Sequence, residues 1–222
     1  MAAGDTYSIL RPKIYVAPVA ATTILPAIPT PTFANPNPDI TWPAQWMRVK
    51  RTGNGAQITV NAPMQDITSD EVGVIGVVSA GTENVSIAWQ TRTPTMDLIQ
   101  KLAHFTKTVK ASQVGPPAFP AYDIYKLDVG SQPMMIGIEG NIAKNSMTEF
   151  GGKVIAFAYN AIQTENTQLV FRTTGNDSIV QPAATVRCLP GSLVAAQVTA
   201  TGLSLSDLDE KFNLIVIPAP GT

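Results

Sequence analysis

The sequence is short of charge, and this shortage excludes several classes of protein. Asp, Glu, Lys and Arg make up 14% of the 222 residues, against about 25% in a typical soluble domain. The formal net charge is −1, so copies of the chain repel one another weakly and self-association is favoured. A near-neutral chain also lacks the phosphate-neutralising surface of a general nucleic-acid binder.

Cysteine and histidine each occur once, which argues against disulfides, metal sites and histidine-based catalysis. Cys188 alone cannot form an intramolecular disulfide or a cysteine-rich zinc site. His104 has no second imidazole to complete a metal site and no motif that would make it a general base. We therefore expect neither a metal nor a cofactor, and we interpret Cys188 as a structural thiol.

Long apolar runs and catalytic motifs are missing as well. The longest apolar run, residues 72–80, is Gly-rich and shorter than the roughly 20 residues that span a bilayer. Residues 1–18 show no basic region followed by an apolar run, so we expect no secretory signal and folding in a reducing cytoplasm. No phosphate-binding glycine loop or nucleophile elbow is present, and the acidic pairs lie in polar stretches. We predict that the protein is not an enzyme.

Proline, in contrast, is concentrated near the start of the chain. Seven of the 18 prolines lie in residues 17–43, and each fixes φ and removes a backbone donor, so this stretch cannot be a helix or a central strand. Interspersed apolar residues such as Leu25 and Phe33 favour an extended arm that lies across a surface. A disordered tail is the alternative. We predict an extended N-terminal arm, 1–45, and a single β-sandwich domain, 46–222.

From residue 46 onward the pattern mostly has the period of two that is typical of strands. Val85, Ile87 and Trp89 alternate on one face. Segments 48–52 and 57–61 flank Gly53-Asn54-Gly55, which predicts a hairpin closed by an Asn-Gly turn. Further strands are predicted at 122–129, 134–139, 154–161, 168–173, 193–199 and 212–217. So many short strands predict an all-β fold, either a two-sheet β-sandwich or a small barrel.

One segment has helical spacing instead. Thr93 fits an N-cap and Pro94 the first helical position. The spacing predicts a flanking helix over 94–105 that covers one open side of the β-structure. The core-facing residues predicted for this helix are Leu98, Ile99, Leu102 and Phe105.

The order of these segments resembles that of the major tail tube proteins of tailed bacteriophages. The resemblance rests on residues 56–61 (AQITVN), the acidic connection 66–71, residues 85–90 (VSIAWQ), the helix 94–105 and residues 167–175 (TQLVFRTTG), and it covers about 46–185. It implies a β-sandwich or small barrel with one flanking helix, in a virion protein made in the host cytoplasm. It also implies hexameric rings stacked into a tube, contacts with other tail proteins, and DNA that passes through the lumen without specific binding. It implies no catalytic residue.

Stacked rings need surfaces that join neighbouring subunits. The arm and the segment 61–83 are the candidates for crossing between rings, and the apolar residues 72–78 need a cover, either a neighbour or the chain's own second sheet. The basic cluster at 48–51 would face the acidic connection of another subunit. The candidate contact residues are Arg48, Lys50, Arg51, Asp66, Asp70, Glu71, Val74, Ile75, Phe33 and Trp42.

A carbohydrate- or receptor-binding β-sandwich is the alternative function. It would use aromatic side chains as a stacking platform, and the candidates are Trp42, Trp46, Trp89, Tyr122 and Tyr125. The alternation around Trp89 instead favours a place for this residue in the core with Val85 and Ile87.

Overall fold

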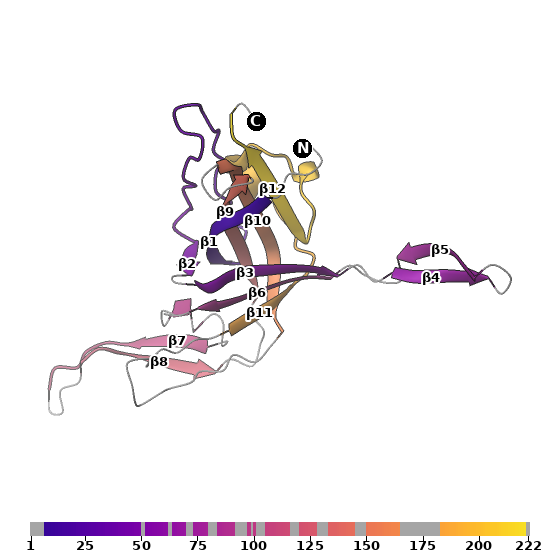
Figure 1. The fold of residues 1–222 in the computed structure, drawn as a ribbon. Coiled ribbons are helices and arrows are strands. Elements are labelled where there is room, and N and C mark those ends of the chain that lie inside the picture. Colours follow the sequence, from indigo (N-terminus) through magenta and orange to yellow (C-terminus); the bar gives the residue numbers. More distant parts are fainter. Residues whose placement is uncertain are drawn as a thin grey trace.

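The protein is mostly antiparallel β-structure with little helix, which confirms the predicted all-β class. The computed structural model describes residues 7–49, 52–61, 64–69, 73–79, 84–91, 97–98, 100, 105–115, 120–127, 133–144, 150–164 and 183–220. Figure 1 shows a central body of strands from which two hairpins extend.

One large sheet contains eight of the strands, and its order is β2-β1-β9-β10-β11-β6-β3, with β12 also paired to β10. Its members are β1 (Tyr7–Pro18), β2 (Met47–Val49), β3 (Thr52–Asn61), β6 (Asn84–Thr91), β9 (Met134–Lys144), β10 (Phe150–Gln163), β11 (Ala183–Cys188) and β12 (Phe212–Pro218). Two further pairs form separate hairpins: β4 (Met64–Ser69) with β5 (Gly73–Ser79), and β7 (Phe105–Lys110) with β8 (Tyr122–Leu127).

Strand β10 connects two parts of the large sheet. Its first part pairs with β12, from Gly152 to Ala158, and its last residues pair with β11, from Ala161 to Gln163. Buried side chains of β1, β9 and β10 form one cluster with those of β6 and β11. Two parts of a single sheet therefore enclose this core, and the sheets are not closed into a barrel. The barrel alternative was wrong.

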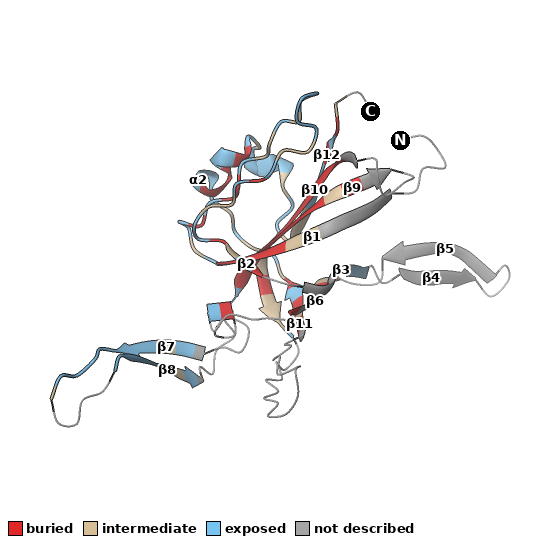
Figure 2. Ribbon diagram, turned by 60° about the vertical axis from the view of Figure 1, so that its left-hand side comes forward, coloured by how far each residue is buried: buried red, intermediate tan, exposed pale blue. Residues whose placement is uncertain are grey.

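The other face of β1, β9 and β10 is buried too, because alternate side chains of each strand point to it. Tyr15, Met135, Phe157 and Tyr159 form a second cluster there with Leu25, Ile40 and Trp46. We call residues 19–46 the strap, since this Pro-rich stretch runs across its own sheet. Figure 2 shows the buried strands beneath it.

Short polar contacts hold the strap in place. The Leu25 amide donates to the carbonyl of Gln197 at 2.9 Å, and the Gln197 side chain donates to the carbonyl of Ala20 at 2.8 Å. The Trp46 indole donates to the carbonyl of Ile24 at 2.7 Å. The first part of the predicted arm is different, because Tyr7–Pro18 is strand β1 and lies between β2 and β9. The structure leaves the proposed domain division at residue 45 untested.

Most of the predicted strands are confirmed where the structure describes them. The strands predicted at 85–90, 134–139, 154–161 and 212–217 lie within β6, β9, β10 and β12, and β8 covers most of 122–129. The segment 168–173 lies outside the described residues. In the predicted helix, Asp97, Leu98 and Gln100 are helical and Leu98 is buried in the first cluster; Ile99 and Leu102 have no described side chains.

Three predictions of local structure were wrong. Gly53-Asn54-Gly55 is part of β3 and not a turn: β3 pairs with β6 at Thr52 and from Ala56 to Asn61, and residues 53–55 form an irregularity between these paired parts. Segment 193–199 is not a strand: Ala195–Val198 is helix α2, and Thr199–Thr201 is a 3-10 turn. Phe105 begins strand β7 and is not part of the predicted helix.

Candidate assembly surfaces

The β4–β5 hairpin extends far from the folded body, as a continuation of the β3–β6 ribbon (Figure 1). Among the residues that the structure describes, β4 and β5 pair only with each other. Asp66 lies in β4 and both Val74 and Ile75 in β5, whereas Asp70 and Glu71 are outside the described residues. An isolated two-stranded hairpin is at best marginally stable in water.

The β7–β8 hairpin is a second projection, below β6 and β11 in the view of Figure 1. Val109, Val114 and Tyr122 are 66%, 98% and 51% exposed. Lys107 pairs with Asp123 at 2.9 Å and lies 6.0 Å from the ring centre of Tyr125. The hydrogen bond to Asp123 raises the pKa of Lys107 above its ordinary value. This exposed pair joins the two strands, and the apolar residues of the hairpin remain in water.

The predicted basic cluster is described only in part. Arg48 is exposed on β2, the strand at one end of the large sheet, where it pairs with Tyr15. Lys50 and Arg51 lie outside the described residues. Phe33, in the strap, is 86% exposed. Arg48 and Phe33 are therefore available to a neighbour, and their contact role stays a prediction.

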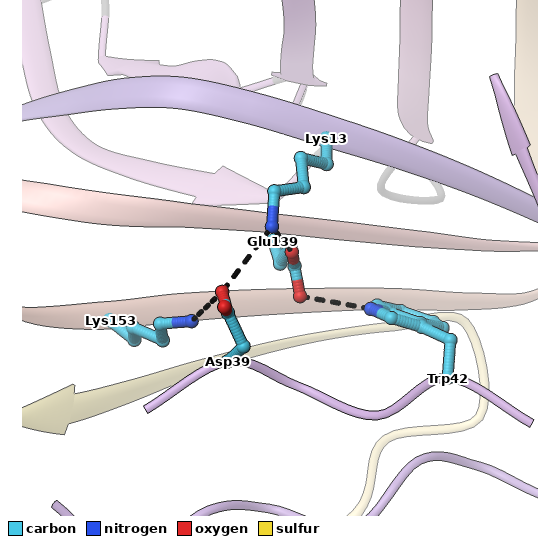
Figure 3. Close-up of polar contacts among 5 residues, drawn as sticks. All are labelled: Lys13, Asp39, Trp42, Glu139 and Lys153. Atoms are coloured by element: carbon cyan, nitrogen blue, oxygen red, sulfur yellow. Dashed lines mark hydrogen bonds and ion pairs between the residues drawn. The ribbon is translucent and has the colours of Figure 1, made fainter. Parts of the chain in front are cut away.

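Trp42 is different, because its partners belong to its own chain. Its ring stacks on Tyr15 with centres 4.1 Å apart, and its indole donates to Glu139 Oε2 at 2.9 Å (Figure 3). It also lies against Gly137, where a β-carbon would come within 2.1 Å of the ring. Trp42 thus fixes the strap to β9, and a contact with a second copy is not needed to explain it.

Glu139 is the buried centre of a polar network that the sequence reasoning missed. Its side chain is 3% exposed, and Oε1 lies 2.7 Å from the Lys13 ammonium. Asp39 of the strap lies 3.5 Å from Lys13 and 3.7 Å from Lys153 (Figure 3). The hydrogen bond and charge of Glu139 raise the pKa of Lys13. The available signal was a carboxylate inside an apolar alternating strand, which is buried only when paired.

The side chains that the sequence offered as candidates for catalysis or metal binding have structural roles where the structure describes them. Cys188 is buried, and the loss of solvation raises the pKa of its thiol to about 12, which disfavours a nucleophilic thiolate. Asp207 accepts from the hydroxyl and amide of Ser204, and these bonds lower its pKa. Across the described part of the chain, no group of three or more His, Cys, Asp or Glu side chains is placed to hold a metal. His104 is outside that part.

The aromatic platform of the alternative function is not formed. Trp89 is buried in the first cluster with Val85 and Ile87, as its alternation predicted. Trp46 is buried in the second cluster on the opposite face of the sheet. The tryptophans therefore do not combine with the exposed Tyr122 into one stacking surface.

No protein-family model matches the chain, and no curated protein matches it in sequence. Within the described residues, none of the helices has the length and apolar character needed to cross a bilayer.

Proposed function

We propose that this chain is a structural protein that assembles with copies of itself into stacked rings, forming the tail tube of a bacteriophage virion through which DNA reaches the host. The observation that supports this most strongly is the pair of hairpins that extend beyond the folded body (Figure 1). Neither hairpin has a sheet or helix behind it in the described residues, and a neighbouring subunit would supply that support. Assembly therefore accounts for two elements that a monomer leaves uncovered.

The open edge of the large sheet agrees with the same function. Among described strands, β12 pairs with β10 on one side only, and its Leu214 and Val216 side chains are exposed. An edge strand with apolar side chains promotes association unless another chain covers it. The resemblance of the sequence to tail tube proteins then gives the form of the assembly, with six subunits in each ring and other tail proteins at its ends.

Passage of DNA requires a lumen that holds phosphates weakly. The net charge of −1 and the low charged fraction fit this requirement, since a lumen rich in Lys and Arg would retain DNA through counterion release. The function needs no catalytic group. The protein would be made in the host cytoplasm and act in the virion.

Electron microscopy of the purified protein over a range of concentrations tests the proposal, with sedimentation of the same samples. We expect rings or hollow tubes of uniform width. A protein that stays monomeric up to its solubility limit would contradict the proposed function.

A hairpin deletion tests the structural argument behind it. Asn61 and Asn84 are paired residues at the ends of β3 and β6, so a two-residue Asn-Gly turn in place of 62–83 closes the ribbon and removes β4–β5. We expect a folded protein that no longer stacks into tubes. Circular dichroism and tryptophan emission provide the folding control, and tubes at the normal yield would show that the β4–β5 hairpin does not join rings.

A further inference from the structure

A groove near the end of the chain combines leucine side chains with carboxylates. Its volume is about 290 Å³, and it is lined by Gly191, Ser192, Leu193, Leu205, Leu208, Asp209 and Glu210. Leu205 is exposed, and Leu193 and Leu208 are partly exposed. The groove thus offers apolar surface next to negative charge.

The groove is preformed by hydrogen bonds within its own segment. The amide of Gly191 donates to the carbonyl of Glu210 at 2.8 Å, which joins its two sides. Asp209 Oδ1 accepts from the amide of Lys211 at 2.7 Å. Leu193 and Leu208 pack against the second buried cluster. A ligand would therefore meet a fixed surface and would not need to order it, which favours binding.

The β7–β8 hairpin has the complementary properties. Val109, Val114 and Tyr122 are exposed apolar or aromatic side chains, and the hairpin carries Lys110 and Lys126 in addition to the paired Lys107. Neither Lys110 nor Lys126 forms an ion pair with any residue that the structure describes. The described hairpin residues therefore include three lysines against one carboxylate, Asp123.

The segment that forms the groove has the opposite charge balance, with more carboxylates than cations. Residues 192–211 contain Asp207, Asp209 and Glu210 against the single cation Lys211. In Figure 2 the segment around α2 lies at the top and the β7–β8 hairpin at the bottom, so the hairpin lies away from the segment of its own chain that forms the groove. A contact between two different surfaces of two copies is heterologous and builds a ring or a stack.

We propose that the β7–β8 hairpin of one copy docks in the groove of residues 191–210 on a second copy. The proposal rests on the proposed function, because it names one of the contacts through which the subunits assemble. Val114 and its neighbours would cover the leucines, and Lys110 would approach Glu210. Such charge pairs set the register and the partner of an interface, while the buried apolar groups provide its affinity.

A disulfide between copies tests the contact directly. The double variant Val114→Cys with Ser192→Cys places one thiol at the exposed hairpin end and one in the groove, and native Cys188 is buried. On oxidation of assembled protein, we expect a ladder of covalent dimers and larger species on a non-reducing gel. The control pair, Val114→Cys with Ala34→Cys, puts the second thiol on an exposed strap residue and should give no ladder.

A charge exchange tests the complementarity. Lys110→Glu and Glu210→Lys should each raise the concentration needed for half-assembly about tenfold, and the combined exchange should restore it to within about threefold. Gln45→Lys adds one positive charge at an exposed strap residue outside both surfaces and is the control for Glu210→Lys. Restoration in the double variant supports the proposal, whereas single variants that assemble normally overturn the predicted charge pairing.

The outcomes distinguish failure of the proposed docking from failure of the proposed function. Tubes that form without a ladder from the Val114→Cys, Ser192→Cys protein overturn the docking and leave the tube function standing. A wild-type chain that never assembles overturns both. A ladder in assembled protein, absent from the control pair, supports the docking.

Discussion

Glu139 shows how a buried charge can make the stability of the fold depend on its ion-pair partner. Its carboxylate is buried, with Lys13 on one oxygen and the Trp42 indole on the other. Removal of one member of a buried pair leaves the other charge without compensation, which costs more than neutralising the buried group itself. The two ends of the same interaction should therefore respond unequally to mutation.

We predict that Lys13→Met lowers the free energy of unfolding by about 2–3 kcal/mol, below the roughly 3–5 kcal/mol of a fully buried pair, because the Lys13 side chain is 33% exposed and water screens the pair. Glu139→Gln keeps an acceptor for Trp42 and should cost about 1 kcal/mol. Lys153→Met is the control: its partner Asp39 is 89% exposed, so the change should stay below about 1 kcal/mol. Urea denaturation measures all three, and equal losses for Lys13→Met and Lys153→Met would contradict the argument.

Cys188 gives a prediction about pH. Burial raises the pKa of its thiol from 9.0 to about 12, so at pH 8 the native thiolate fraction falls about a thousandfold and a thiol reagent should label it only after unfolding. Because the unfolded thiol loses its proton first, this stabilisation is present below pH 9 and is lost as pH rises from 9 towards 12. Labelling kinetics and unfolding midpoints at pH 8 and 10 test this, with Cys188→Ala as the variant that removes this part of the pH dependence. Equally fast labelling of native and unfolded protein would refute it.

At the scale of the elements, the sequence pattern predicted the buried strands. It did not predict elements that depend on contacts between residues far apart in the sequence. Strands β6, β9, β10 and β12 follow from their apolar patterns. Helix α2 does not, because residues 193–199 have an apolar sequence that also suits a strand, and Gln197 bonds to Val194 within the helix and to Ala20 in the strap. Tertiary contacts overrode local preference there. The Pro-rich composition predicted an extended segment, but not that its own sheet would be the surface beneath it.

The strap depends on the absence of a side chain at Gly137. A β-carbon there would come within 2.1 Å of the Trp42 ring, so Gly137→Ala must displace Trp42 from Tyr15 and Glu139. We expect a loss of about 2–4 kcal/mol in the free energy of unfolding and a change in tryptophan emission. Gly202→Ala is the control, because Gly202 has φ of 77° and open space around it, so only about 1 kcal/mol of backbone strain is added. Unchanged emission in Gly137→Ala would contradict the role of Trp42.

At the scale of the whole molecule, the described part of the chain has a body buried on both faces of its central strands and two projections without a cover. The strap closes the second face within the monomer, while contact with a neighbour through its exposed Phe33 stays a prediction. The hairpins β4–β5 and β7–β8 remain, and they extend in different directions (Figure 1). Assembly should therefore order the projections and leave the body as it is.

Hydrogen exchange of monomer and tube tests this division of the chain. In the monomer, the Leu25 amide is already bonded to Gln197 and the Trp46 indole to Ile24, so both should exchange slowly before any assembly. The amides of β7 and β8 belong to an exposed two-stranded hairpin and should exchange quickly in the monomer, because local opening there breaks few contacts. Assembly should slow exchange in β7–β8 by at least about tenfold and change the strap little. The reverse pattern, with a strap that becomes protected only in tubes, would mean that it folds on contact with a neighbour, and that the strap rather than the hairpin controls the start of assembly.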